Sequence, residues 1–81
     1  MAVVAYTLIR TEQQRVNELI KKLKKFRFVK EVTPVYGEYN MIVKTETDSI
    51  DELNLFVYNE LRRTTDIAMT TTMITAKISE K

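Results

Sequence analysis

The sequence of 81 residues contains no cysteine, no histidine and no tryptophan, and it has a single glycine and a single proline. Without cysteine there is no disulfide, no zinc–thiolate site and no thiol nucleophile. Without histidine the commonest general base and the commonest transition-metal ligand are missing. The carboxylates are scattered, so no set of hard-metal ligands stands out. We therefore expect no catalytic residues, no metal and no cofactor, and we predict that the protein is not an enzyme.

Long apolar runs are absent as well. No stretch approaches the roughly 20 apolar residues that a membrane helix needs. The apolar start has no basic region before it, and Arg10 and Glu12 soon interrupt it, which is untypical of a signal peptide. We expect a cytoplasmic protein that does not contact membranes. The length allows one domain, residues 1–81, and a domain this small can bury more surface by assembling with further copies.

The formal net charge is only +2, but the charges are unevenly distributed. Residues 1–30 carry eight basic and two acidic side chains, whereas residues 31–81 carry five basic and nine acidic ones. The basic excess lies in residues 21–30, which contain no acid. Such a run either binds phosphate backbones or forms a solvated helix face.

Hydrophobic periodicity predicts four strands and two helices. In chain order we expect a strand at 2–9, a helix from 11 to about 26, strands at 29–36 and 39–46, a helix after residue 49, and a strand at 67–78. Thr11 with Gln14, and Ser49 with Glu52, have the spacing of capping boxes that begin the two helices. Asp66 precedes the last strand.

The apolar residues of the helices predict which side faces the core. The first stripe is Val16, Leu19, Ile20, Leu23 and Phe26, and the second is Ile50, Leu53, Val57 and Leu61, with Phe56 at its side. Pro34 lacks an N–H, so its strand is expected to lie at an edge of the sheet or to be irregular at that point. Gly37 and Glu38 are expected to form a tight hairpin turn.

The order β-α-β-β-α-β predicts an α+β, ferredoxin-like fold, with a four-stranded antiparallel sheet and both helices on one face. In the first strand, Val4, Tyr6 and Leu8 alternate with further apolar residues, so that both faces of the sheet carry apolar groups. The face without helices must be covered, most simply by a second copy. We therefore expect a homodimer formed through the sheets.

Three groups of polar residues are candidates for a ligand site. The first is the turn Gly37, Glu38, Tyr39 and Asn40, which is either a plain hairpin turn or a binding loop. In the second group, Thr70 and Thr72 share one face of the last strand, and they reflect either strand propensity or hydroxyl ligands. Asn54 and Tyr58 form the third group, four residues apart on one helix face, where a tyrosine can equally belong to the core or an interface.

The chain resembles the C-terminal effector-binding domain of the Lrp/AsnC family of feast/famine regulators, also called the RAM domain. The residues that carry the resemblance are 3–9, 29–32, 36–44, 49–54 and 70–72. At the hairpin the family has glycine, any residue, tyrosine and aspartate, followed by an apolar run. Asn40 stands here in place of the aspartate. Full-length members carry an N-terminal helix-turn-helix domain, which this sequence lacks, so we expect a stand-alone effector-binding domain.

The resemblance implies an amino-acid effector and an assembly of dimers into a higher oligomer, with an octamer expected. By this resemblance the turn from Gly37 to Asn40 contacts the backbone groups of the effector. Asn54 and Tyr58 face its side chain, and Thr70 and Thr72 complete the pocket. Because Asn40 brings no negative charge to the effector's ammonium group, either Glu38 compensates or amino-acid binding has been lost. A cationic effector side chain is disfavoured, because the pocket has no acid near Asn54 and Tyr58.

The resemblance predicts a sensor that oligomerises and regulates transcription without binding DNA itself, acting through a full-length Lrp/AsnC regulator or another protein. One alternative is a nucleic-acid-binding ferredoxin-like module, although clustered aromatic residues typical of RNA recognition are absent. Another alternative is a small dimeric α/β-barrel enzyme, which shares the topology but needs a base that is not evident here.

Overall fold

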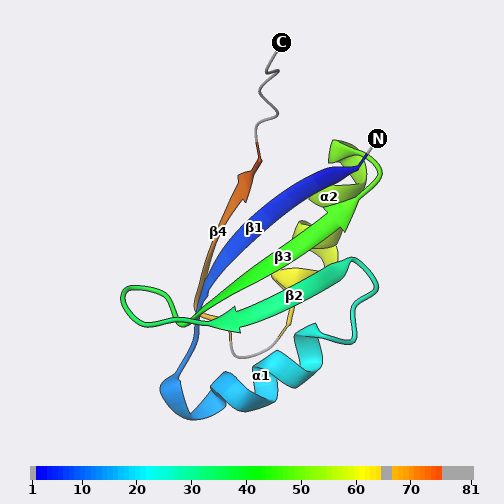
Figure 1. Cartoon of the computed structure of the whole chain (residues 1–81). Coiled ribbons are helices and arrows are strands. Elements are labelled where there is room, and N and C mark those ends of the chain that lie inside the picture. Colours follow the sequence, from blue (N-terminus) through cyan, green and yellow to red (C-terminus); the bar gives the residue numbers. More distant parts are fainter. Residues whose placement is uncertain (1, 65–66, 76–81) are drawn as a thin grey trace.

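A computed structural model describes residues 2–64 and 67–75 of the chain. Its four strands form one antiparallel sheet in the order β2-β3-β1-β4 (Figure 1). The elements are β1 (Val3–Arg10), a 3₁₀ turn (Gln13–Arg15), α1 (Val16–Leu23), β2 (Val29–Pro34), β3 (Met41–Thr47), α2 (Ile50–Phe56), a π-helical turn (Val57–Leu61) and β4 (Met69–Ile74). The predicted ferredoxin-like α+β fold is therefore confirmed.

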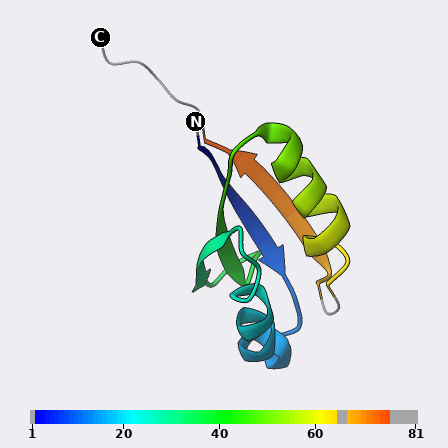
Figure 2. The same cartoon turned by 90° about the vertical axis from the view of Figure 1, so that its right-hand side faces the viewer.

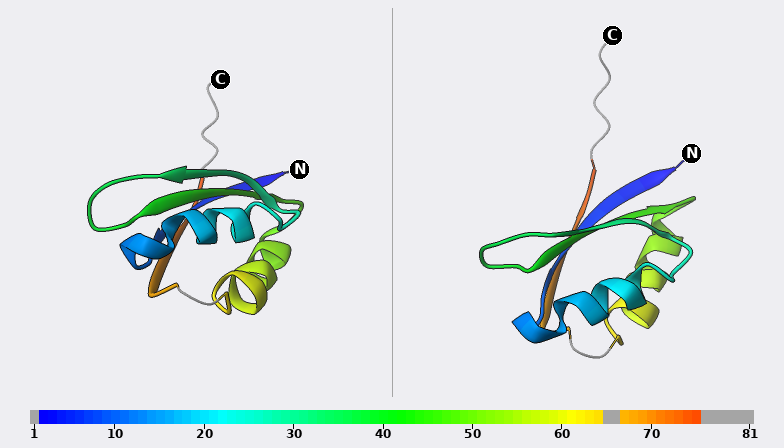
Figure 3. Two further views of the ribbon diagram at one scale, coloured as in Figure 1. Left: turned by 90° about the horizontal axis from the view of Figure 1, so that it is seen from below. Right: turned by 60° about the horizontal axis from the view of Figure 1, so that its bottom comes forward.

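Both helices lie on the same side of the sheet (Figures 2 and 3). Along β1, Ala5, Thr7 and Ile9 are fully buried beneath them, as strand alternation requires. Ile9 pairs with Met41 of β3, which is also fully buried. The helices complete this core with Leu19, Leu23, Leu53, Phe56, Val57 and Leu61.

The other side of the sheet carries a second apolar surface, which we call the open face. Val4, Tyr6 and Leu8 of β1 point to this side and are only partly buried. Leu8 pairs with Ile42 of β3, and Tyr6 pairs with Met73 of β4, so their side chains lie side by side. Met73 is half exposed. The prediction that both faces of the sheet are apolar is confirmed.

The first helix begins later than expected. Thr11 forms no cap, and no side chain caps the 3₁₀ turn or α1. Instead, the Thr11 N–H donates a hydrogen bond of 2.6 Å to Oδ1 of Asn40. This tertiary contact fixes the chain at Thr11, and the predicted capping box with Gln14 is therefore wrong. The predicted apolar stripe from Val16 to Phe26 is confirmed, since its members are buried or packed against the core.

The start of the second helix is as predicted, because Oγ of Ser49 accepts a hydrogen bond of 3.1 Å from the Glu52 N–H. The residues that the second helix buries in the core differ from those expected. Ile50, the first helical residue, is 52% exposed, whereas Phe56 is only 2% exposed. The Phe56 ring packs edge-on against Phe26 and Phe28, with ring centroids 5.3 and 5.6 Å apart. This aromatic cluster turns Phe56 inward and makes it a central core residue.

The connection between β2 and β3 is longer than the predicted two-residue turn. β2 ends at Pro34 and β3 begins at Met41, and the Val35 N–H closes the loop on the Asn40 carbonyl at 2.7 Å. Gly37 has a φ of +121°, which side chains of L-residues rarely adopt. β2 is an edge strand, as Pro34 predicts. β4 is shorter than expected, and both Asp66 and the predicted strand end at 76–78 lie outside the described residues.

We predict that Phe56→Ala destabilises the protein by about 3–5 kcal/mol, because a fully packed ring leaves a cavity that the core does not refill. Leu55→Ala is the matched control, since its neighbouring side chain is 62% exposed and its loss should cost less than about 0.5 kcal/mol. Urea unfolding at equal protein concentration measures both. Equal effects of the two substitutions would contradict the assignment of Phe56 to the core.

Candidate functional site

The four predicted residues on α2, its π-helical extension and β4 line one cleft. It lies between α2 and β4, which run alongside each other in Figure 2. The cleft has a volume of about 340 Å³, which is within the range of small-molecule sites. Its lining consists of Leu53, Asn54, Val57, Tyr58, Arg62, Thr70, Thr72 and Ile74. The structure therefore brings together Asn54, Tyr58, Thr70 and Thr72, as the sequence predicted.

Local geometry explains this convergence. Asn54 and Tyr58 are separated by one helical turn and lie on the exposed side of the helix. On β4, Thr70 and Thr72 point to the helix side of the sheet, since they pair with the buried Ile9 and Thr7 of β1. The polar groups of the cleft thus come from two elements that are distant in sequence.

One hydroxyl group that lines the cleft, that of Thr72, already has a hydrogen-bond partner. Oγ1 of Thr72 lies 3.0 Å from Oγ1 of the buried Thr7, so the two hydroxyls share a hydrogen bond. Leu53 and Val57 give the same cleft an apolar wall. The cleft can therefore accept a ligand that presents both apolar atoms and hydrogen-bonding groups.

The predicted hairpin residues lie elsewhere. The Asn40 N–H donates to the Ile9 carbonyl at 2.8 Å, and the Arg10 guanidinium donates to the Glu38 carbonyl at 3.2 Å. The Tyr39 hydroxyl lies 2.9 Å from Oγ1 of Thr71, which points away from the helices. Tyr39 therefore lies at the open face, whereas the Asn40 side chain bonds Thr11, directly after β1. Within one chain the sheet separates Tyr39 from the cleft.

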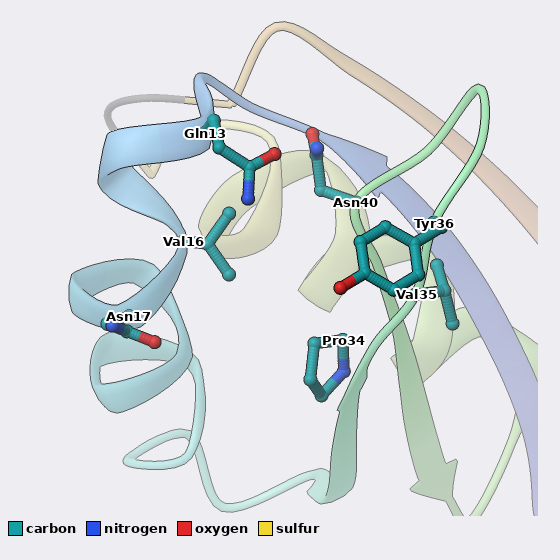
Figure 4. A pocket seen from close by; sticks show the side chains of 7 residues that line it. All are labelled: Gln13, Val16, Asn17, Pro34, Val35, Tyr36 and Asn40. Atoms are coloured by element: carbon teal, nitrogen blue, oxygen red, sulfur yellow. The ribbon is translucent and has the colours of Figure 1, made fainter.

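Asn40 also borders a second cavity, which lies between the start of the first helix and the hairpin loop. It has a volume of about 310 Å³. Gln13 and Val16 point toward the loop that carries Tyr36 and Asn40 (Figure 4). The Asn40 side-chain oxygen is already bound to Thr11, and Tyr36 is fully exposed. The volume of this cavity is close to that of the cleft beside α2, and its lining also combines apolar residues with polar ones.

Arg62 is the one charged residue that lines the cleft among the described residues, and the sequence interpretation missed it. Its guanidinium carbon lies 5.2 Å from the centroid of the Tyr58 ring, a distance that permits a cation–π interaction. Arg62 lies four residues after Tyr58 and eight after Asn54, and so continues the same spacing. Extending that helical spacing by one turn would have found it.

Neither a metal centre nor a membrane segment is visible in residues 2–64 and 67–75. In this part of the chain no three acidic side chains gather closely enough to hold a metal ion. No helix there is both long and apolar enough to cross a membrane.

The comparisons with known proteins agree on one family. The family model of the Lrp/AsnC ligand-binding domain matches residues 4–79. The HTH-type transcriptional regulator FL11 of Pyrococcus furiosus is 34% identical over 55 residues, which cover 68% of this chain and 36% of FL11. The chain thus spans about a third of the length of this curated relative.

Two solved structures illustrate the likeness in fold. The crystal structure of FFRP-DM1 has a TM-score of 0.87 and 40% identity, and the match covers 91% of this chain and 99% of that one. The transcriptional regulator NMB0573 of Neisseria meningitidis, solved as an L-Met complex, has a TM-score of 0.83 at 12% identity. That match covers 93% of this chain and 50% of NMB0573, and it shows the shared fold alone.

We predict that Asn40→Ala destabilises the protein by about 1–3 kcal/mol, because it leaves the buried N–H of Thr11 without its 2.6 Å acceptor. Asn40→Asp keeps an acceptor and should cost less. Asn17→Ala, an exposed residue that lines the same cavity, is the control and should change stability by less than about 0.5 kcal/mol. Urea unfolding compares the three. If Asn40→Ala behaves like the control, the loop is not anchored through this bond.

Proposed function

We propose a function for this chain from the fact that it belongs to the Lrp/AsnC ligand-binding domain family. Its matched relative FL11 is a transcriptional regulator, which sets the chain among regulatory proteins rather than enzymes. The alternative of a small α/β-barrel enzyme is therefore dropped. We infer that the domain binds a free amino acid and that binding acts on its assembly with other copies. We expect it to work in the cytoplasm, without contacting DNA directly.

The observation that carries this proposal is the cleft between α2 and β4. An amino acid offers a carboxylate, an ammonium group and a side chain, and each polar group needs a partner once it leaves water. The hydroxyl of Thr70 and the amide of Asn54 supply such partners at the rim of a cavity of about 340 Å³. That NMB0573, which has the same fold, was solved with L-Met supports an amino-acid ligand.

We include assembly in the proposal because the hairpin and the cleft, the two parts of the proposed site, lie apart within one chain. Tyr39 of the hairpin contacts Thr71 on the open face, whereas the cleft lies on the helix side of the sheet. One site that contains both groups therefore requires two protomers. We propose that the hairpin of one protomer meets the cleft of another and that the effector binds between dimers.

The open face supports the first step of this assembly. Leu8, Ile42, Tyr6 and Met73 form adjacent pairs across three strands, and water contact with such a surface is unfavourable. We propose that a second copy covers it and forms a homodimer, sheet against sheet. Dimers of this kind then assemble into a higher oligomer, with an octamer expected.

Regulation of transcription requires contact with DNA. Both helices of the described residues pack on the sheet, and they do not form a helix-turn-helix. We propose that a full-length Lrp/AsnC regulator co-assembles with this domain, so that effector binding here alters DNA binding there.

Ligand binding is tested by isothermal titration of the assembled protein against the twenty amino acids. We predict that at least one binds and that Thr70→Val weakens it about five- to tenfold, the effect of one lost hydrogen bond. Thr33→Val is the matched control, because Thr33 is an exposed threonine of the edge strand β2 and does not line the cleft. Absence of binding across the panel, with intact oligomers present, would contradict the sensor function.

The dimer is tested by Leu8→Lys, which places an ammonium group in the centre of the open face. We predict that light scattering will detect monomers of this variant. Leu55→Lys, on the exposed outer side of α2, should leave the dimer intact. Persistence of dimers in Leu8→Lys would show that the copies contact each other through another surface.

A further inference from the structure

The charge that lines the cleft beside α2 in the described residues is positive. Among the described residues its lining contains one cationic group, Arg62, and no carboxylate. Arg62 has no carboxylate partner within residues 2–64 and 67–75, where the ion pair present joins Arg15 and Glu18. The Arg62 guanidinium lies over the face of the Tyr58 ring. The guanidinium therefore keeps its five N–H donors available for a ligand.

The position of Arg62 is set by the π-helical turn at the end of α2. The Arg62 N–H donates to the Val57 carbonyl at 2.9 Å, five residues back instead of four. The preceding residue, Leu61, is fully buried and anchors this turn in the core. The wider turn thus places Arg62 beside Thr70, with which it also lines a neighbouring cavity of about 290 Å³.

From this geometry we infer that the cleft selects an amino acid with a carboxylate side chain, of the aspartate or glutamate type, and that Arg62 is the residue that determines this specificity. The inference rests on the proposed function, in which α2 and β4 face the side chain of the effector. A guanidinium binds a carboxylate through two parallel hydrogen bonds. The Asn54 amide and the Thr70 hydroxyl lie in the same lining and can donate to the same group.

The lining also explains what the cleft excludes. A lysine or arginine side chain would bring a second cation next to Arg62 and find no carboxylate there. A leucine or methionine side chain would displace water from the Arg62 guanidinium but offers no hydrogen-bond acceptor in return. Such a binding mode is unfavourable, because removing water from an unpaired charge is costly. Charge at Arg62 thus discriminates among amino acids of similar size.

The test is isothermal titration of the assembled protein with L-glutamate, L-aspartate, L-glutamine, L-leucine and L-lysine. We expect L-glutamate or L-aspartate to bind about tenfold or more tightly than L-glutamine and L-leucine, because a paired charge distinguishes them. Arg62→Gln should remove this preference while leaving L-glutamine within about twofold of its affinity for the unchanged protein. Arg62→Glu should shift the preference toward L-lysine.

Arg63→Gln is the matched control, since Arg63 is the next residue, is exposed and does not line the cleft. An equal loss for every amino acid in Arg62→Gln would place Arg62 on the effector's α-carboxylate and overturn the inference. Tightest binding of a neutral or cationic amino acid would also overturn it, while leaving the proposed sensor function in place. Failure of all amino acids to bind the unchanged protein would overturn both.

Discussion

The two-sided apolar character of β1 is the constraint on which the rest of the structure depends. Ala5, Thr7 and Ile9 are sealed by the helices, whereas Val4, Tyr6 and Leu8 lie on a face that no element of the described residues covers. A sheet with helices on one side always has this asymmetry. Here the second face is apolar enough that covering it would contribute favourably to assembly.

The same sheet divides the functional groups. The hairpin loop is fixed to the open face through Tyr39 and Thr71, and the cleft opens on the helix side through Thr70 and Thr72. Consecutive threonines of one strand thus serve two different surfaces. In the proposed site, which combines the hairpin with the cleft, ligand binding therefore depends on the assembly of protomers.

Asn40 has a structural role in the hairpin. Its amide oxygen accepts a hydrogen bond from the buried Thr11 N–H. The backbone of Asn40 also joins the loop to Val35 and Ile9. The loop is therefore closed on its own start at Val35 and fixed to β1 at Ile9, and Asn40 makes both contacts.

Strand alternation and helical spacing were enough to predict the topology, the edge position of β2, the two apolar faces and the convergence of Asn54, Tyr58, Thr70 and Thr72. Features that depend on tertiary contacts were not predictable in this way. Thr11 binds a distant asparagine instead of capping a helix, and the rings of Phe26 and Phe28 pack against Phe56 and hold it in the core. The π-helical turn, which sets the direction of Arg62, has no signal in the periodicity.

The most direct test of the central claim, that ligand binding and assembly share one site, is native mass spectrometry of the protein with and without a pool of amino acids. The account predicts a ring of dimers that gains the mass of about one amino acid per subunit, as expected for one cleft in each chain. A plain dimer without ligand, or a monomer that binds an amino acid, would contradict it.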